Sequence, residues 1–285
     1  MSKWNMIVDV ALCENCHNCT LSTKDEHVDN DFPGYAAPQP RHGPDWIKIT
    51  RKVRGSGTMV DAAYLPTMCN HCDDAPCIKA TGGDGSIYKR PDGIVIIDPQ
   101  KAKGRQDLVA ACPYNAIVWN EELFLPQAWI FDAHLLDAGY KEPRASQACP
   151  TGALRAIKMT DEERQRRIEI DHLEELDPSL NTRPRVLYKN LHRFTRCFIG
   201  GSVVASVDGI EDCVADAKVT LSASSQVVAE TTTDAFGDFK FDDIAPDGSS
   251  FTISIIHGEH GGHTIDVVAA DSVFLGSLAL EKSLR

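Results

Sequence analysis

The chain has 285 residues, 42% of them hydrophobic, which is enough for about two domains that each bury a core. Its 41 acidic residues outnumber its 29 basic ones, and the net charge of −12 argues against nucleic acid or an anionic membrane as the main partner. The sequence has no signal-peptide pattern and no apolar run of about 20 residues, so we expect a cytoplasmic protein, or one that is exported only together with a partner. Ten cysteines in that compartment indicate metal or redox chemistry rather than disulfides.

Residues 1–195 carry eight of the cysteines among short strands and Gly- or Pro-rich turns. Segments rich in β-branched residues between turn signals predict five strands: Met6–Val10, Trp46–Val53, Gly93–Asp98, Ala116–Asn120 and Arg185–Asn190. Three helices are predicted at Gly104–Ala111, Gln127–Ala138 and Asp161–Glu175. Thr160 lies three residues before Glu163, and this capping-box pattern marks the start of the last helix.

Residues 196–285 predict a second, all-β domain, joined through a linker near Arg193–Gly201. Short alternating runs are separated by Gly, Asp and Ser, which is typical of an antiparallel sandwich or barrel. These runs are Ser202–Ser206, Lys218–Ser222, Val227–Thr232, Asp238–Phe241, Ser250–Ile256 and Thr264–Val268. The segment Thr233–Phe241 resembles the turn and strand of transthyretin-like modules.

Eight cysteines form two triplets and two Cys-Pro units. The triplets are Cys13-x2-Cys16-x2-Cys19 and Cys69-x2-Cys72-x4-Cys77, and the Cys-Pro units begin at Cys112 and Cys149. Bacterial ferredoxins use C-x2-C-x2-C-x3-C-P, in which the fourth cysteine ligates the other cluster. Here Thr23 and Thr81 occupy the fourth positions, while Ala102, Arg105 and Leu108 occupy the triplet positions before Cys112. Two four-cysteine cages can therefore form, with none of the eight cysteines left over.

Spacing alone does not fix which Cys-Pro unit completes which triplet. The pseudo-symmetry of ferredoxins joins the first motif to the last and pairs the middle two. We therefore expect one 4Fe–4S cluster in cage 1, formed by Cys13, Cys16, Cys19 and Cys149, and another in cage 2, formed by Cys69, Cys72, Cys77 and Cys112. Two zinc sites are the alternative, but zinc is usually held by two separated C-x2-C pairs. Cys197 and Cys213 are predicted to be buried small apolar side chains.

The cysteine motifs resemble those of the four-motif iron–sulfur subunits of molybdopterin oxidoreductases of the dimethyl sulfoxide reductase type. The branch with the closer likeness contains the small subunits of pyrogallol–phloroglucinol transhydroxylase and of enzymes like resorcinol hydroxylase. Both the appended β-domain and several segments carry this likeness: Leu65–Cys77, Asp92–Pro99, Cys112–Tyr114, Ala133–Asp137 and Arg183–Leu191. It extends over nearly the whole chain and implies a bacterial-ferredoxin-like domain followed by a transthyretin-like domain.

The resemblance also implies a partner. A large subunit would carry molybdenum on two molybdopterin guanine dinucleotides and all the catalytic residues, and this chain would be its electron-transfer subunit in a heterodimer. The reaction would transfer or add a hydroxyl group on a polyhydroxybenzene of the pyrogallol or resorcinol type, in anaerobic aromatic degradation. An electron-transfer subunit of another molybdopterin oxidoreductase, a free-standing ferredoxin-like carrier and a scaffold with structural clusters are the alternatives.

The chain departs from the family pattern at two of the four cluster positions. Trp129, Asp132 and Ala145 replace three cysteines of the fourth motif, and Thr23 also lacks a ligating sulfur. Asp132 is expected to be solvated or salt-bridged rather than a ligand. Two of the four cages of the family pattern are thus predicted to be absent. Their absence lengthens one electron-transfer step and leaves a chain of two clusters instead of four.

Two kinds of side chain near the motifs have alternative interpretations. His17 and His71 lie inside the cysteine motifs and either donate hydrogen bonds to cluster sulfurs or face solvent. Trp46, Trp119 and Trp129 are expected to pack in the core or at an interface.

Overall fold

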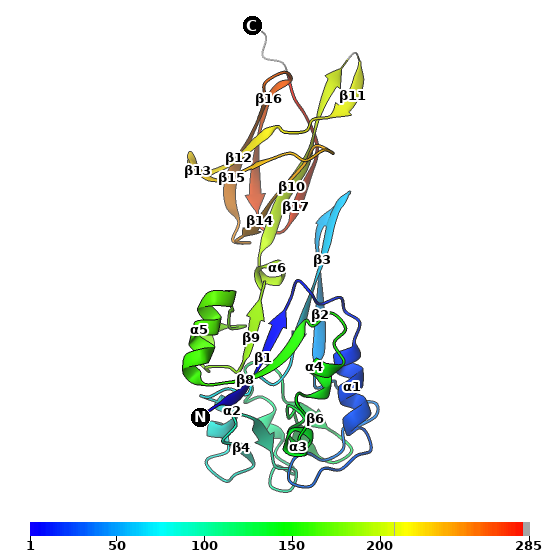
Figure 1. The fold of residues 1–285 in the computed structure, drawn as a ribbon, viewed down its shortest axis with the longest axis vertical. Coiled ribbons are helices and arrows are strands. Elements are labelled where there is room, and N and C mark those ends of the chain that lie inside the picture. The colour runs from blue at the N-terminus through cyan, green and yellow to red at the C-terminus, as the bar shows by residue number, and fades with distance from the viewer. Residues whose placement is uncertain (208, 282–285) are drawn as a thin grey trace. The chain divides into compact units, whose positions relative to one another are not determined.

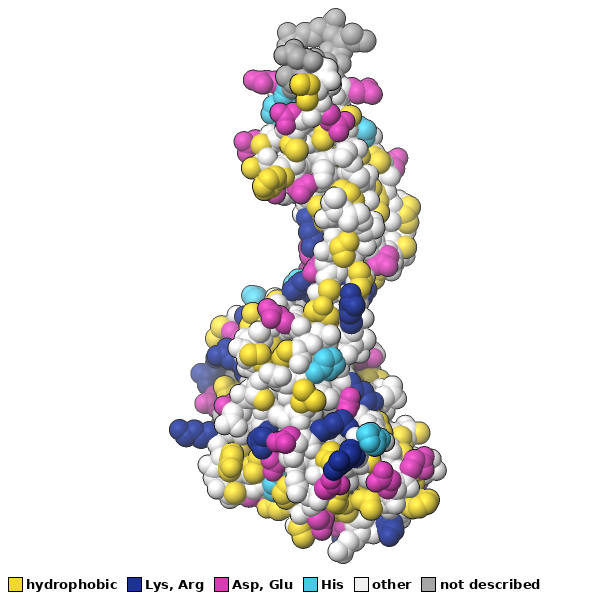
Figure 2. Space-filling view, turned by 90° about the vertical axis from the view of Figure 1, so that its right-hand side faces the viewer, with side chains coloured by type: hydrophobic (Ala, Val, Ile, Leu, Met, Phe, Trp, Pro, Cys, Tyr) yellow, Lys and Arg dark blue, Asp and Glu magenta, His cyan; other side chains and the backbone are white. Residues whose placement is uncertain are grey.

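The computed structural model describes residues 1–207 and 209–281, which form two compact units (Figure 1). Unit 1 consists of Met1–Arg51 and Tyr64–Leu191; unit 2 consists of Lys52–Ala63 and the chain from His192 onward. Within the described ranges, no helix is both long and apolar enough to cross a membrane. The basic and acidic side chains of unit 1 are interspersed on the face shown in Figure 2. Nothing in the sequence indicated that residues 52–63 belong with unit 2.

A three-stranded sheet organises unit 1, with β1 (Lys3–Asp9) between β8 (Leu154–Met159) and β9 (Val186–Lys189). The β1 strand pairs antiparallel with β8 and parallel with β9. Met6 and Val8 are fully buried on one face of β1. Helix α5 (Asp161–Asp171) follows β8, and the side chain of Thr160 and that of Glu163 form the predicted capping box.

Short hairpins and helices form the rest of unit 1. The hairpins are β4 (Ile87–Lys89) with β5 (Val95–Ile97), β6 (Val118–Asn120) with β7 (Leu125–Gln127), and β2 (Lys48–Ser56) with β3 (Met59–Thr67), the last shared with unit 2. The helices are α1 (Asn18–His27), α2 (Pro76–Ala80), α3 (Ala133–Asp137) and α4 (Arg144–Gln147), with 3-10 turns η1 (Gln106–Leu108) and η2 (Pro178–Leu180).

Two of the three predicted helices of unit 1 are wrong over most of their length. Gly104–Ala111 contains only the η1 turn, and Gly104 itself has a φ of 80°, which a helix excludes. Gln127–Ala138 begins at the end of β7, and only α3 is helical. Phe131 and Asp132 adopt φ values of 56° and 47°, so the right-handed helix cannot extend through them.

Unit 2 is a two-sheet β-structure. After α6 (His192–Thr195), strand β10 (Cys197–Val207) pairs with β11 (Ile210–Cys213), β14 (Asp238–Ile244) and β17 (Val273–Ala279). The second sheet has the order β13 (Gln226–Thr232), β12 (Lys218–Ala223), β15 (Ser249–His257), β16 (Gly261–Ala269). Side chains from both sheets, among them Ile199, Leu221 and Ile253, form one buried apolar core.

The six predicted strands of this unit are confirmed, and with them the fold class of a ferredoxin-like iron–sulfur domain followed by an all-β domain. The predicted linker is wrong in part, because β10 already begins at Cys197. Hairpin residue Arg54 is fully buried in unit 2, where its guanidinium donates to Asp61 at 3.2 Å and to Asp242.

Candidate metal centres

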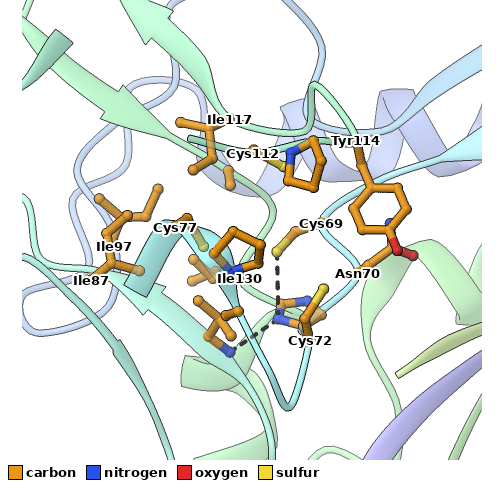
Figure 3. A pocket seen from close by; sticks show the side chains of 16 residues that line it. Cys69, Asn70, Cys72, Cys77, Ile87, Ile97, Cys112, Tyr114, Ile117 and Ile130 are labelled. Atoms are coloured by element: carbon orange, nitrogen blue, oxygen red, sulfur yellow. Dashed lines mark hydrogen bonds between the residues drawn. The ribbon is translucent and has the colours of Figure 1, made fainter. Parts of the chain in front are cut away.

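The four thiols of cage 2 line one pocket in unit 1 (Figure 3). Cys69, Cys72, Cys77 and Cys112 surround this pocket. Apolar side chains form most of the remaining wall: Ile87, Val95, Ile97, Ile117, Ala128 and Ile130. The same residues, apart from Ile130, belong to one core cluster that also contains Cys112. The predicted pairing of the second triplet with Cys112 therefore corresponds to one contiguous site.

Backbone hydrogen bonds hold the loop that carries the second triplet. Arg185 N donates to Asn70 O at 2.7 Å, and Asp73 N donates to Arg183 O at 2.9 Å, so the loop lies against the segment before β9. Lys89 Nζ donates to the carbonyls of His71 and Cys72 at 2.7 and 2.9 Å. The geometry of the loop is therefore set by partners from β4 and from the segment that leads into β9.

An ionic cluster around the buried Arg185 reinforces this loop. The Arg185 guanidinium, 1% exposed, bonds both Asp73 and Asp161, and Lys89 Nζ lies 3.0 Å from Asp73 Oδ1. Burial raises the pKa of Asp73, but hydrogen bonds from Arg185 and Lys89 outweigh burial and hold it well below its usual range. Asp73 is therefore ionised throughout the physiological pH range.

Burial raises the pKa of the three thiols that the second triplet contributes to cage 2. Burial, followed by the nearby Cys112 and Cys77, raises the pKa of Cys69 well above its ordinary value. Burial is also the main cause that raises the pKa of Cys72 to about 11 and that of Cys77 to about 12. These thiols would have to lose their protons to hold a metal cluster, because the thiolate is the ligating form.

His71 lies beside cage 2 as a neutral imidazole. It is 1% exposed, and burial, aided by Lys89, lowers its pKa to about 3. Its Nδ1 accepts from Val95 N at 3.0 Å and lies 3.8 Å from Cys69 Sγ. Because Nδ1 accepts the hydrogen bond from Val95 N, it cannot donate one to the Cys69 sulfur. In the neutral ring the proton is therefore on Nε2.

The three-stranded sheet brings the parts of cage 1 together. β1 leads directly into the loop of Cys13, and β8 follows Cys149; these strands pair through Val8 and Leu154. Asn18 Nδ2 donates to Ala148 O at 3.5 Å, which links the start of α1 to the residue before Cys149. Cys19 is buried in the first turn of α1.

The thiols of cage 1 are close enough to interact electrostatically. Burial raises the pKa of Cys13, and the neighbouring Cys149 and Cys16 thiols add to that effect. Burial likewise raises the pKa of Cys19 to about 11, with contributions from Cys13 and Cys149. Cys16 is exposed, so this cage has a side open to solvent.

The donor sets fit iron–sulfur clusters better than single ions. In the described part of the chain, no three His, Cys, Asp or Glu side chains are close enough to hold one metal ion. A structural zinc ion needs four ligands at about 2.0–2.3 Å from one point. Four cysteines around an apolar pocket are the ligand type and number that a 4Fe–4S cluster uses.

The third-motif cage is replaced by apolar core and surface ion pairs. Ala102 and Leu108 are both fully buried in the core cluster that contains Cys112. Arg105 instead reaches the surface, where its guanidinium pairs with Asp84 and Asp107. Thr81 Oγ1 donates to Ile78 O at 2.8 Å, one turn back. None of these four side chains offers a ligating sulfur.

The fourth-motif positions hold buried polar and aromatic side chains. Asp132 is fully buried, and its Oδ1 lies 3.1 Å from Nε2 of the fully buried His27. Asp132 Oδ2 accepts from Arg144 N at 2.8 Å, and Trp129 stacks on Phe131 with ring centroids 4.8 Å apart. The predicted solvated state of Asp132 is therefore wrong, because its side chain is fully buried and hydrogen-bonded, while the salt-bridged state stays a prediction.

The remaining predicted residues divide into buried and exposed groups. Trp46 and Trp129 pack in the core as predicted, whereas Trp119 is half-buried and donates to Glu121 at 3.1 Å. His17 is exposed. Cys197 is fully buried, but the same prediction for Cys213 is wrong because it lies on the exposed strand β11.

Sequence reasoning missed Lys89, Arg185 and His27. Arg185 lay inside a predicted strand, and no local pattern marked it as a buried ionic partner. His27 lies four residues after Thr23 on α1, a spacing that puts both on one helix face, but α1 was not predicted.

Comparison with known proteins agrees with this architecture. Residues 60–159 match the family model of the 4Fe–4S dicluster domain. The chain is 40% identical over 284 residues to the pyrogallol hydroxytransferase small subunit of Pelobacter acidigallici, covering 98% of this chain and all of that protein. It is 30% identical over 194 residues to a tetrathionate reductase subunit of Salmonella typhimurium, covering 66% of this chain and 73% of that protein. It is 34% identical over 122 residues to a putative dimethyl sulfoxide reductase iron–sulfur subunit of Halobacterium salinarum, covering 42% of this chain and 46% of that protein.

Proposed function

Because the chain belongs to the family of iron–sulfur subunits that includes the pyrogallol hydroxytransferase small subunit, we propose that it serves as the electron-transfer subunit for a molybdopterin enzyme acting on polyhydroxybenzenes. The observation that carries this proposal is the 40% identity over 98% of the chain and the whole of that relative. The tetrathionate reductase and dimethyl sulfoxide reductase subunits share a smaller part of the chain, 66% and 42%. Similarity along the whole length therefore favours a substrate of the pyrogallol or resorcinol type over tetrathionate or a sulfoxide.

The cysteines of the two cages are proposed to hold one 4Fe–4S cluster each: Cys13, Cys16, Cys19 and Cys149 in cage 1, and Cys69, Cys72, Cys77 and Cys112 in cage 2. Bound clusters would supply one-electron redox chemistry. In cage 2, Ile87, Ile97 and Ile130 exclude water from the thiols, and Lys89 fixes the loop carbonyls. Burial and hydrogen bonds to sulfur set cluster potentials, so the two cages, one apolar and one partly open, are expected to differ in potential.

The same proposal includes a large catalytic subunit with molybdenum on two molybdopterin guanine dinucleotides, in a heterodimer. We also propose a cytoplasmic location, because the cytosol keeps cysteine thiols reduced and therefore able to bind iron. The functional division into residues 1–195 and 196–285 also remains a proposal. On the face of unit 1 shown in Figure 2 the charges are interspersed, so this face would favour a partner recognised by shape and local pairs rather than by one large charged patch.

Anaerobic co-expression of the chain with a large molybdopterin subunit from the same organism tests the proposal. The purified complex should contain molybdenum, about eight irons and eight acid-labile sulfides per small subunit, and two cubane EPR signals on reduction. It should convert pyrogallol- or resorcinol-type substrates. Tightly bound zinc without sulfide would refute the cluster assignment. A stable monomer that copurifies with no large subunit would favour a free carrier.

A further inference from the structure

A cavity of about 300 Å³ in unit 1 is lined by residues of the three-stranded sheet and of α5, and it is separate from the pocket of cage 2. Ile7, Ile157 and Leu173 form its apolar part. Ile7 and Leu173 belong to the small core cluster against which Ile168 of α5 packs. This volume is at the lower end for small-molecule sites, about 300–1,000 Å³, and suits a ligand of one ring.

The strand register places two cations on either side of β1 on this face. Arg155 of β8 lies opposite Ile7, and Lys189 of β9 lies opposite Asp9. Ile7 and Asp9 share one face of β1 because side chains alternate along a strand, so Arg155 and Lys189 share that face too. The sheet therefore presents an apolar strip between two basic side chains.

Neither of these two cations forms an ion pair with the acidic residues that line the cavity, although Asp9 lies opposite Lys189 in the strand register. Asp171 is paired with Arg167, and Asp9 Oδ1 accepts from two neutral donors, Asn190 Nδ2 at 2.8 Å and Ala11 N at 3.0 Å. Over residues 1–207 and 209–281, neither Arg155 nor Lys189 makes an ion pair. Two unpaired cations beside an apolar surface complement an organic anion with an apolar body.

We propose that this cavity binds a small organic anion, namely a monocyclic carboxylate. Its ring packs on Ile7, Ile157 and Leu173, while its carboxylate accepts hydrogen bonds from the Arg155 fork and from Lys189. The site is independent of the function proposed above. The carboxylate could come from a free small molecule or from an acidic side chain of a partner, and the free molecule is favoured because the apolar part of the cavity matches a ring.

The cavity also borders cage 1. Leu12, which precedes Cys13, and Gly152, three residues after Cys149, both line it. A bound anion therefore lies beside the backbone that holds these cysteines, where its negative charge disfavours reduction of the cluster proposed for that cage. In this respect the inference rests on the proposed function, whereas binding itself does not.

Calorimetry with the full chain, purified anaerobically, tests binding with benzoate as the probe. Benzoate should bind one-to-one and about tenfold or more tighter than acetate or inorganic phosphate, since only benzoate buries a ring. Arg155→Gln and Lys189→Gln should each weaken benzoate about tenfold through the loss of a charged hydrogen bond. The matched control Arg166→Gln removes an exposed charge of α5 outside the cavity and should leave affinity unchanged. Unfolding transitions of the variants establish that each remains folded.

Three results would overturn the proposal. One is equal affinity for benzoate, acetate and phosphate. Another is an equal effect of Arg155→Gln and Arg166→Gln. The third is benzoate binding to the isolated chain but not to the assembled complex, which would assign the cavity to a partner's acidic side chain. Benzoate should also lower the midpoint potential of one cluster in the wild type but not in Arg155→Gln. Binding without that shift would refute the effect on cage 1, and absence of clusters would refute only the proposed function.

Discussion

Replacing Asp73 by Asn should destabilise unit 1 by about 3 kcal/mol. The Asp73 carboxylate is paired with Arg185, with Lys89 at 3.0 Å and with Lys3 at 3.4 Å. Breaking a buried ion pair typically costs about 3–5 kcal/mol because the other charge is left buried. The lower end applies because the Asp73 side chain is 16% exposed and Arg185 retains Asp161. For a unit of this size the melting temperature should fall by about 6–12 °C.

Chemical and thermal unfolding of the cluster-loaded chain measure this effect, with Asp74→Asn as the matched control. Asp74 is the next residue, and its partner Lys79 is exposed, so its loss should have no measurable effect. The carboxyl of Asp73 titrates near pH 3.9 when unfolded and well below that when folded. Its stabilising effect is therefore fully present above about pH 5 and is lost as the pH falls through the folded pKa. Equal stability of the two variants between pH 5 and 8 would refute this account.

Three further outcomes follow from the geometry. Cys77→Ser should halve the iron and acid-labile sulfide content while the exposed Cys213→Ser leaves both intact; equal losses would contradict the assignment of cage 2. Gly237→Ala should destabilise unit 2 by at least about 1 kcal/mol without loss of iron. Gly237 has a φ of 77°, and an added Cβ would lie 2.4 Å from Val203 O. An unchanged thermal unfolding transition would contradict this prediction. Thr160→Ala should cost about 1 kcal/mol in denaturant unfolding because it removes the capping box of α5, and Thr160→Ser should retain most of that stability.

The cysteine constellation could be predicted from sequence because ligand chemistry imposes a strict pattern. Two triplets and two Cys-Pro units allow only two complete cages. In the structure the four cysteines of cage 2 line one pocket, while the ligand set of each cage stays a prediction. The strands of unit 2 were equally readable, since one face of each sheet is buried and the residues alternate.

The missed features depend on contacts between distant segments. Arg185 and Asp73 lie 112 residues apart, and His27 and Asp132 lie 105 apart, so no local pattern could pair them. The helix predicted at Gln127–Ala138 is wrong because Phe131 and Asp132 adopt left-handed φ values; Asp favours this conformation only weakly, and Phe does not favour it. The short helices α2 and α4 have too few turns to show any periodicity.

The assignment of residues 52–63 to unit 2 has a consequence for biosynthesis. Arg54 leaves the ribosome early, but Asp242, one of its two carboxylate partners, is 188 residues further along. During translation unit 2 cannot complete its fold until the strands after residue 192 have been synthesised. Until then the β2–β3 hairpin lacks its partner strands, and the Arg54 guanidinium lacks Asp242. A gene split or a protease cut near residue 192 would therefore release a fragment that lacks one of its own structural segments rather than an autonomous domain.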